Sequence, residues 1–364
     1  MGYAKMNRQS GINKKPKVLM IGPGRDVMGG ISTVVNSYYE LGIDKQVDLK
    51  YIATMEDGSA LKKLWVAAKA YLQFCFSIKN YDIVHVHMAA QASYTRKSLF
   101  IKKAHKVGKK IIIHSHAADF DDFFFKQADD KKRENIKYIF SIADKVITLS
   151  EEWAEFFGKN ICSEDKIVVM HNAVIMPEYV KTDYRDHNVL FLGRLGERKG
   201  TYDILNVIPD ILKTVPDAMF YLGGDGDIEQ CREITVKNSF ADHVKFLGWV
   251  RGANKEEYLK RCSIFTLPSY HEGMPMSVLE AMSYGLATVS TNTGGIPQII
   301  DNGVNGIRID AGNTEALKQN LIQLLTNPDD KEKMGKAGCV TISQKFNAQK
   351  TFDNLVNIYL KLFY

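Results

Sequence analysis

The sequence of 364 residues predicts an α/β protein made of two Rossmann-like halves in tandem. Short apolar runs of strand length alternate with helical stretches in both halves of the chain. The polar segment 177–187 interrupts this alternation once. The length suits two ordinary domains, and 45% hydrophobic with 25% charged residues is the composition of a globular protein.

The first half begins with an apolar strand at 18–21 that ends at Gly22-Pro23-Gly24. Short apolar strands that alternate with helices indicate a parallel sheet covered on both faces. The further elements expected here are helices at 31–41, 95–107 and 151–157, and strands at 83–87, 110–114, 145–149 and 166–170.

The second half repeats the pattern after the polar segment, with an amphipathic helix at 347–362 that we expect to cross back onto the first half. Ligands of open parallel sheets bind beyond the carboxyl ends of the strands, so two such sheets facing each other form a cleft. The expected strands are 188–192, 219–222, 244–246, 264–267 and 287–290, and the expected helices 202–214, 255–261 and 276–284. The resulting division is an N-terminal Rossmann-like domain (1–176), a linker (177–187), a C-terminal Rossmann-like domain (188–344) and a C-terminal helix (345–364).

Five scattered cysteines, an odd number without metal-ligand spacing, argue against a disulfide framework or a zinc site and favour a reducing compartment. The first fifteen residues are polar and basic, without the apolar core of an export signal. No apolar stretch approaches the roughly 20 residues that a membrane-spanning helix needs. We therefore expect a cytoplasmic protein.

The strongest chemical signal is the run SYHEGMPMSVLEAMSYG at 269–285, which follows an expected strand. Glu272 lies in its loop, Pro275 suits the start of a helix, and Glu280 comes early in that helix. A helix N-terminus offers free N–H groups and partial positive charge to an anion. Two carboxylates beside a bound phosphate can hold hydroxyl-rich groups. Alone, this spacing is more often two solvated glutamates, but the Gly-Met-Pro between them and a second cluster favour a site.

The second cluster is the run FLGRLGERKG at 191–200, between an expected strand and an expected helix. Its glycines, Gly193 among them, let the backbone approach a ligand, and Arg194 and Lys199 can bind phosphate oxygens. Basic loop residues are usually only solvated. Their position at a strand end, in the same half as Glu272, favours a binding role.

Together with Gly223-Gly-Asp-Gly226 and Thr293-Gly-Gly-Ile-Pro297, the two clusters resemble the retaining GT-B glycosyltransferases of family 4, and the likeness covers the whole second half. The resemblance implies that Glu272 contacts the donor sugar and Glu280 the ribose. It also implies that Arg194 and Lys199 bind the diphosphate and stabilise its leaving charge. The remaining donor-site residues that it implies are Gly30, Gly193, Val250, Gly273, Met274, Pro275 and Met276.

In the first half, Gly29 and Gly30 follow the first strand after a loop. A dinucleotide-binding loop is the alternative, but the spacing opposes it because Val27 stands where a third glycine would be needed. The family resemblance favours donor phosphate and acceptor binding by Gly29 and Gly30. It implies that residues 1–176 form the acceptor-binding domain and residues 188–344 the nucleotide-sugar-binding domain. We count Asp119 as a further acceptor-site residue, with simple loop polarity as the alternative.

Four histidines lie on or just after two expected strands of the first half. His116 best matches the family histidine that reaches the donor sugar, so we count it with the catalytic residues. For His114, a structural role is equally well supported. His85 and His87 share one face of a strand, and we interpret them as cleft lining or structure, with metal binding as the less favoured alternative.

The resemblance implies a hexosyltransferase-type enzyme that retains the anomeric configuration. No Asp-x-Asp motif stands out, so we expect metal-independent transfer, no bound metal and no cofactor, the nucleotide-sugar being a substrate. We prefer UDP as the nucleotide of the donor, with GDP as the alternative. The acceptor implied is a hydroxyl of a glycan or a lipid-linked molecule in cell-surface polysaccharide biosynthesis.

The net charge of +6 is unevenly distributed, because the excess of lysine and arginine lies within residues 1–176. Two stretches there, 61–78 and 96–110, combine basic with apolar residues. Such helices can lie on an anionic membrane, although helices with a solvated basic face look much the same. We expect peripheral attachment to the inner face of the membrane.

Three other functions remain open at this point. An epimerase acting on UDP-sugars or a phosphorylase of the same fold would use a similar site, although no clear pyridoxal lysine is found. A nucleic-acid-binding protein could use the basic half, but it would leave the donor-site clusters unexplained. We therefore expect no nucleic-acid partner.

Overall fold

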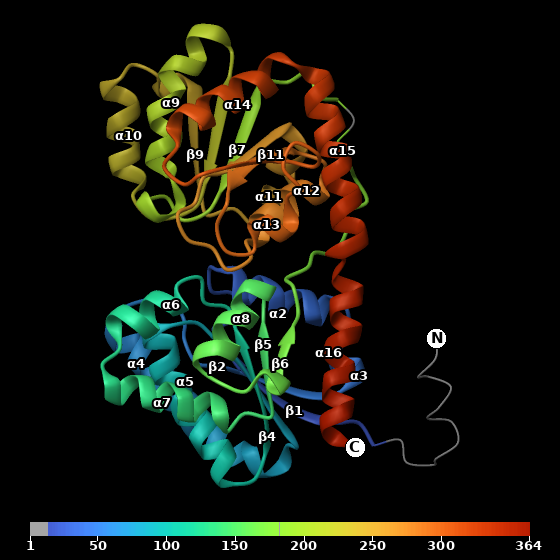
Figure 1. Cartoon of the computed structure of the whole chain (residues 1–364). Helices are drawn as coiled ribbons and strands as arrows, with labels where there is room; N and C mark the ends of the chain where they lie inside the picture. Colours follow the sequence, from blue (N-terminus) through green and yellow to red (C-terminus); the bar gives the residue numbers. More distant parts are fainter. Residues whose placement is uncertain (1–13, 182) are drawn as a thin grey trace.

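The computed structural model describes residues 14–181 and 183–364 and contains two parallel six-stranded sheets, the C-terminal one above the N-terminal one in Figure 1. The predicted pair of Rossmann-like halves is therefore confirmed. Residues 1–13, which include most of the polar and basic stretch considered for an export signal, lie outside the described residues. None of the described helices combines the length and the apolar character needed to cross a membrane.

The N-terminal sheet has the strand order β2-β1-β3-β4-β5-β6. Helices cover both of its faces (Figure 1), which explains why β3 is buried at every residue. Its strands are β1 (Lys17–Gly22), β2 (Asp48–Ala53), β3 (Ile83–Met88), β4 (Lys110–Ser115), β5 (Lys145–Thr148) and β6 (Ile167–Val169). Its helices are α2 (Gly30–Glu40), α3 (Ile43–Gln46), α4 (Ala60–Ser77), α5 (Gln91–Lys106), α6 (Phe120–Asp122), α7 (Asp130–Ser141) and α8 (Glu151–Asn160), with a π-helical turn η2 (Phe123–Gln127).

The C-terminal sheet has the order β12-β11-β10-β7-β8-β9, the arrangement of a dinucleotide-binding Rossmann fold. Its strands are β7 (Asn188–Leu192), β8 (Met219–Gly223), β9 (Val244–Gly248), β10 (Ile264–Leu267), β11 (Ala287–Thr291) and β12 (Ile307–Ile309). Its helices are α9 (Thr201–Thr214), α10 (Ile228–Lys237), α11 (Gly252–Arg261), α12 (Met276–Ser283), α13 (Ile296–Ile299), α14 (Thr314–Thr326) and α15 (Pro328–Lys345), with a short turn η4 (Glu197–Lys199).

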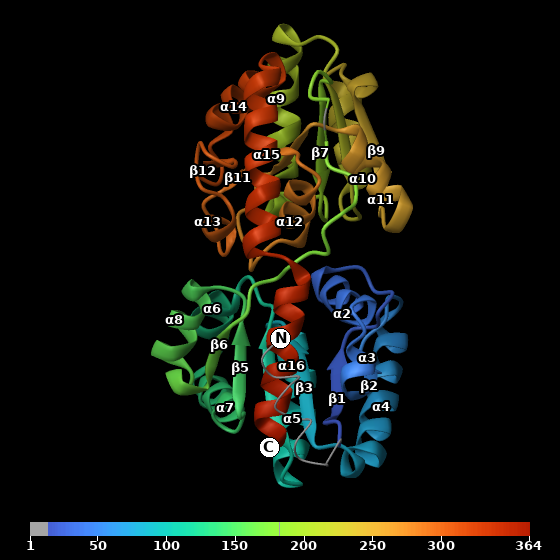
Figure 2. The same ribbon diagram turned by 90° about the vertical axis from the view of Figure 1, so that its right-hand side faces the viewer.

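The last helix, α16 (Ala348–Phe363), runs from the end of α15 down along the N-terminal half, as Figure 2 shows. The side chain of Asn347 caps the N-terminus of this helix. The helix buries Phe352, Leu355 and Tyr359 at helical spacing. The hydroxyl of Tyr359 lies 2.6 Å from Nδ1 of His85 on β3. The predicted crossing of the C-terminal helix onto the N-terminal half is confirmed.

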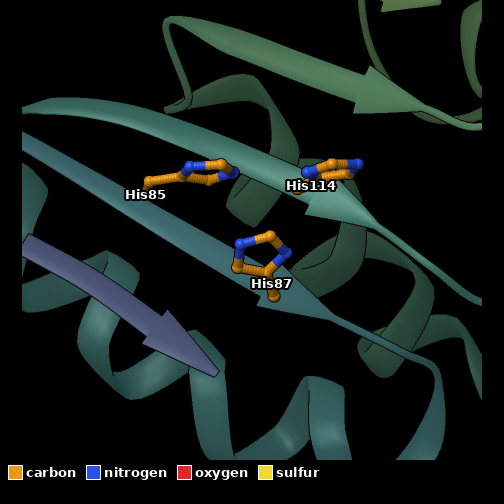
Figure 3. Close-up of side chains that lie close together, drawn as sticks. All are labelled: His85, His87 and His114. Carbon is orange, nitrogen blue, oxygen red and sulfur yellow. The ribbon is translucent and has the colours of Figure 1, made fainter. Parts of the chain in front are cut away.

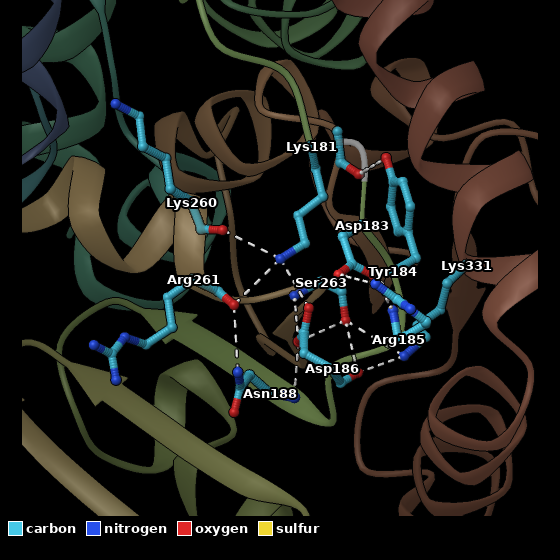
Figure 4. Close-up of polar contacts among 11 residues, drawn as sticks. Lys181, Asp183, Tyr184, Arg185, Asp186, Asn188, Lys260, Arg261, Ser263 and Lys331 are labelled. Atoms are coloured by element: carbon cyan, nitrogen blue, oxygen red, sulfur yellow. Dashed lines mark hydrogen bonds and ion pairs between the residues drawn. The ribbon is translucent and has the colours of Figure 1, made fainter.

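The polar segment 177–187 is held against the C-terminal half by buried polar contacts, drawn in Figure 4. Nζ of Lys181 lies 2.8 Å from a carboxylate oxygen of Asp186, and the Lys181 side chain is only 6% exposed. Lys331 on α15, fully buried, donates to the main-chain oxygen of Asp186 over 2.6 Å. Tyr184 donates to the main-chain oxygen of Gly285 over 2.8 Å. The polar side chains of this segment therefore fix its path, since buried charges need partners.

Candidate active site

The strand order of the C-terminal sheet reverses between β7 and β10, which are neighbours in space but not in sequence. Ligands of open α/β sheets bind at such a switch point. The loop after β7 carries Lys199 and the loop after β10 carries Glu272, and these two side chains form an ion pair. Ser269 donates a hydrogen bond of 2.7 Å to the same carboxylate oxygen of Glu272. Two predicted site residues are thus brought together, with little exposure to solvent.

Two glycines allow the loops around this ion pair to approach each other. Gly200 has a φ of +67°, and a Cβ there would lie 2.1 Å from the main-chain oxygen of Pro268, in the loop after β10. Gly294 has a φ of +53°, and a Cβ there would lie 1.8 Å from the main-chain oxygen of Glu272. A side chain at either position would force these loops apart. These glycines therefore allow the loops after β7 and β11 to lie directly against the loop that carries Glu272.

Glu280 lies on α12, whose N-terminus follows the Glu272 loop. Its carboxylate is 2.6 Å from Nζ of Lys255 on α11, and both side chains are largely buried. The sequence did not single out Lys255, because it stands beside Glu256 and Glu257 in a charged stretch that looks like a solvated helix face. Ser269 lies inside the run at 269–285, where no sequence signal marks it as a partner of Glu272.

Arg194 and Gly193 lie in the loop between β7 and η4. The main-chain N–H of Gly193 donates to the oxygen of Gly223 over 2.9 Å, so the glycine-rich run after β8 lies beside this loop. The Arg194 side chain is exposed, and within the described part of the chain it has no hydrogen-bond partner. Val250, half-buried, follows β9 near the end of β8.

The N-terminal sheet has its own switch point between β1 and β3, and Gly29 and Gly30 lie at the start of α2, beyond β1. A Cβ on Gly30 would be 3.8 Å from Cγ of Met276, the first residue of α12. A Cβ on Gly273 would be 3.5 Å from the main-chain oxygen of His116, beyond β4. The predicted residues of both halves therefore meet around the start of α12.

Two hydrogen bonds join the halves at this place. The side-chain amide of Asn172, which follows β6, donates to the main-chain oxygen of Met274 over 2.7 Å. Arg251, after β9, donates to the main-chain oxygen of Asp26 over 3.2 Å. Neither contact follows from local sequence, although Asn172 does stand at a strand end, where site residues gather.

The four histidines form a cluster on β3, on β4 and directly after β4, and Figure 3 shows three of them, His85, His87 and His114. Nδ1 of His87 lies 2.9 Å from Nε2 of His116, and the rings of His114 and His116 stack with centroids 4.2 Å apart. Ligand atoms of His85, His87 and His114 lie within 4.8 Å of one another. Burial lowers the pKa of all four, so they are neutral near pH 7.

This cluster connects the C-terminal helix, through Tyr359 and His85, with His116. The complete burial of His85 and His87 agrees with the structural interpretation and not with cleft lining. His114 has no hydrogen-bond partner on either ring nitrogen among the described residues, so its contacts are stacking contacts. Asp119 lies half-buried at the start of α6, three residues beyond His116.

Comparison with known proteins identifies the family. The model of glycosyl transferases group 1 matches residues 186–327, and that of glycosyltransferase family 4 matches residues 47–176. The chain belongs to the family 4 glycosyltransferases. This agrees with the resemblance carried by the two clusters of the second half.

Individual relatives of this glycosyltransferase are distant. An uncharacterized glycosyltransferase of Methanocaldococcus jannaschii is 25% identical, over 78% of this chain and 86% of its own. The amylovoran biosynthesis glycosyltransferase AmsK of Erwinia amylovora is 26% identical, over 77% and 70% of the two chains.

Solved structures establish the GT-B fold for this glycosyltransferase. Sucrose-phosphate synthase from Thermosynechococcus elongatus has a TM-score of 0.81 at 16% identity, with 96% of this chain and 99% of that one covered. Anabaena HepE in complex with UDP-glucose has a TM-score of 0.73 at 15% identity, with 95% and 99% covered.

The site of this glycosyltransferase brings together cations, two carboxylates that are each paired with a lysine, and a helix N-terminus. Lys199 and Arg194 can balance the charge of a diphosphate, and the start of α12 adds oriented N–H groups. Glu272 and Glu280 each hold a lysine now, and those lysines can turn to an anion when hydroxyl groups bind the carboxylates. The arrangement suits a ligand that carries both phosphate and hydroxyl groups.

Proposed function

We propose that this glycosyltransferase moves a sugar from a UDP-sugar to a hydroxyl of a glycan or lipid-linked acceptor, with retention, in polysaccharide biosynthesis. The observation that carries the proposal is the Lys199–Glu272 ion pair at the switch point of the C-terminal sheet, beside the start of α12. The complex of the similar structure HepE with UDP-glucose supports a UDP-sugar as the donor. The similarity to the amylovoran biosynthesis enzyme supports a role in polysaccharide biosynthesis.

In the proposed reaction, the bond between the sugar and the diphosphate breaks while negative charge grows on the diphosphate. Lys199, Arg194 and the α12 N-terminus would stabilise that charge once Lys199 turns from Glu272 to the diphosphate, and each donor contributes roughly 3 kcal/mol of barrier lowering, by analogy with oxyanion-hole deletions. The acceptor hydroxyl attacks from the leaving-group side, and its proton passes to the departing phosphate. Glu272 and His116 hold the donor sugar, and Glu280 holds the ribose.

Neither a metal nor a cofactor takes part in this proposal, because lysine, arginine and helix N–H groups supply the positive charge. Full transfer activity in the presence of EDTA is therefore expected. Loss of activity that added Mg²⁺ or Mn²⁺ restores would contradict metal independence.

A thermal-shift screen with UDP- and GDP-sugars tests the donor site, since a ligand that binds the native state raises its melting temperature. We expect UDP-sugars to give the larger shift. Glu280→Ala should weaken the donor-induced shift, whereas Arg194→Ala should keep it and lower turnover. Wild-type kinetics in both variants would show that the site is wrongly assigned.

The reaction type needs separate measurements. Donor consumption that requires an added acceptor indicates transfer, whereas conversion of the donor without acceptor indicates an epimerase, and dependence on inorganic phosphate a phosphorylase. NMR of the product distinguishes retention from inversion, because the anomeric coupling of the new bond can be compared with that of the donor.

A further inference from the structure

Helix α4 is apolar on two opposite sides, which is unusual for a helix that covers a sheet. Val66, Ala70 and Phe74 face the N-terminal sheet and are buried. The opposite side carries an exposed apolar stripe, whose side chains reach 80% exposure at Leu61 and 82% at Phe76. The stripe consists of Leu61, Leu64, Trp65, Leu72 and Phe76.

The stripe is continuous along the helix. At 3.6 residues per turn, its five side chains fall within about 120° of the helix circumference and extend over four turns. Single exposed apolar residues are normal on protein surfaces, but a contiguous patch of this kind marks an interaction site. Something apolar is therefore expected to cover this side of α4.

The neighbouring helix α5 extends the apolar surface. A groove of about 730 Å³ separates the two helices, and its floor is largely apolar. Leu99 on α5 lines the groove and is exposed, and the cations Lys63 and Arg96 also line it. Figure 1 shows α4 and α5 on the same side of the N-terminal half, away from α16.

Cations surround this apolar surface, and neither helix contains an aspartate or glutamate. Lys63, Lys69, Lys103 and Lys106 form no ion pair with any described residue. Nζ of Lys69 lies 5.0 Å from the centroid of the Trp65 ring, so a charge stands directly beside the largest apolar side chain. Lys62 is neutralised by Glu56, at 3.3 Å, and Lys102 donates to Asn135.

We infer that this α4/α5 face binds the surface of an anionic lipid bilayer. Leucine and aromatic side chains would enter the boundary between headgroups and acyl chains, where tryptophan is favoured, and the lysines would contact lipid phosphates. A second copy of the chain fits poorly, because two such faces would bring unpaired lysines together. A nucleic acid would leave the leucines of the stripe without a partner.

The location of this face adds to the proposed function, because it bears on how a lipid-linked acceptor reaches the site. Helix α4 follows β2, so its Leu61 end lies at the carboxyl edge of the N-terminal sheet, the edge that also carries Gly29 and Gly30. An acceptor anchored in the membrane by a lipid would thus reach the site from the bound surface. This last step rests on the proposed function, whereas membrane binding itself does not.

Co-sedimentation of the full chain with vesicles tests the inference. Wild-type protein should pellet with vesicles of phosphatidylglycerol and phosphatidylcholine in equal parts, and not with phosphatidylcholine alone. Replacing Lys69, Lys103 and Lys106 by glutamine should lower the partition coefficient about fivefold per lysine. Trp65→Ser with Phe76→Ser should lower it at least about tenfold.

Matched controls lie on α10, far from this face. Val236→Ser replaces an equally exposed apolar residue, and Lys237→Gln removes an exposed lysine. Both should pellet as the wild type does. Circular dichroism and the donor-induced thermal shift verify folding and the donor site, so a failed donor site is distinguishable from failed membrane binding.

Tryptophan fluorescence reports whether Trp65 enters the bilayer. In Trp249→Phe, the remaining tryptophans are Trp65 and the buried Trp153. Anionic vesicles should shift the emission to shorter wavelengths and make it quenchable by brominated lipid. Three outcomes would each overturn the inference. The protein could pellet equally with neutral vesicles, or the variants could leave pelleting unchanged. It could also bind no vesicles and instead form a dimer that the stripe variants dissociate.

Discussion

The side-chain amide of Asn172 donates a hydrogen bond of 2.7 Å to the main-chain carbonyl of Met274, joining the N-terminal half to the loop that precedes α12. Both residues are buried. Met274 stands between Glu272 and the start of α12, so the bond ties the position of the Glu272 loop to the N-terminal half. Closure of two domains can exclude water from the reaction.

Asn172→Ala should therefore affect coupling between the halves. The change leaves a buried carbonyl without its partner, at a cost of about 1–3 kcal/mol in unfolding free energy. We expect a higher KM for the donor and a larger fraction of donor lost to hydrolysis. Steady-state kinetics with separate detection of hydrolysis and transfer measures both. Asn160→Ala, which removes a bond within α8 alone, should leave the hydrolysed fraction unchanged.

Lys199→Met should combine a structural with a catalytic defect. The change leaves Glu272 buried without its cation, which destabilises a protein by roughly 3 kcal/mol. In the double variant Lys199→Met/Glu272→Gln, most of this stability should return, but transfer should stay absent. Urea unfolding and product formation are measured on the same samples. Lys213→Met, which removes an exposed pair with Asp210, should change stability by less than about 1 kcal/mol. An active double variant would exclude Lys199 from the reaction.

Local sequence predicted most strands and marked the loops after β7 and β10 as candidate site loops, because apolar runs and glycine-rich strand ends are local signals. It did not predict β2 and β12, which lie at the sheet edges. β2, Asp-Leu-Lys-Tyr-Ile-Ala, mixes polar with apolar residues, and β12 has only three residues. A strand paired on one side only need not be apolar throughout, so its pattern is weak.

The partners within the site depend on distant parts of the chain. Glu280 and Lys255 are 25 residues apart, and Asn172 and Met274 are 102 residues apart. Composition and spacing cannot select Lys255 over the other lysines of the chain, since its role comes from the packing of α11 beside α12. For the same reason the sequence showed that 61–78 is basic and apolar, but not which of its apolar residues pack on the sheet and which stay exposed.

Stability should depend on Lys97 and therefore on pH. Burial lowers the pKa of this lysine on α5 from 10.5 to about 7, with a smaller contribution from Arg96. Between these pH values the unfolded chain holds a proton that the folded chain releases, so the contribution of Lys97 to stability rises with pH by about 1.4 kcal/mol per unit. Lys97→Met should thus be more stable than the wild type at pH 7, with little difference at pH 10. Urea unfolding at both pH values measures this, and a constant difference would contradict a neutral buried lysine.

The contact between His85 and Tyr359 should make the protein sensitive to acid. Burial lowers the pKa of His85 from 6.5 to about 3. As pH falls from 6.5 towards 3, the unfolded state gains a proton that the folded state does not, so stability is lost by about 1.4 kcal/mol per unit. The variant His85→Leu/Tyr359→Phe removes the titration and both polar partners together, and such paired replacement can be nearly neutral at pH 7. Its unfolding free energy should therefore fall less steeply below pH 6.5 than that of the wild type. Tyr359→Phe alone retains the histidine and should keep the wild-type slope, with lower stability throughout. Equal slopes for the double variant and the wild type would show that His85 does not titrate differently in the two states.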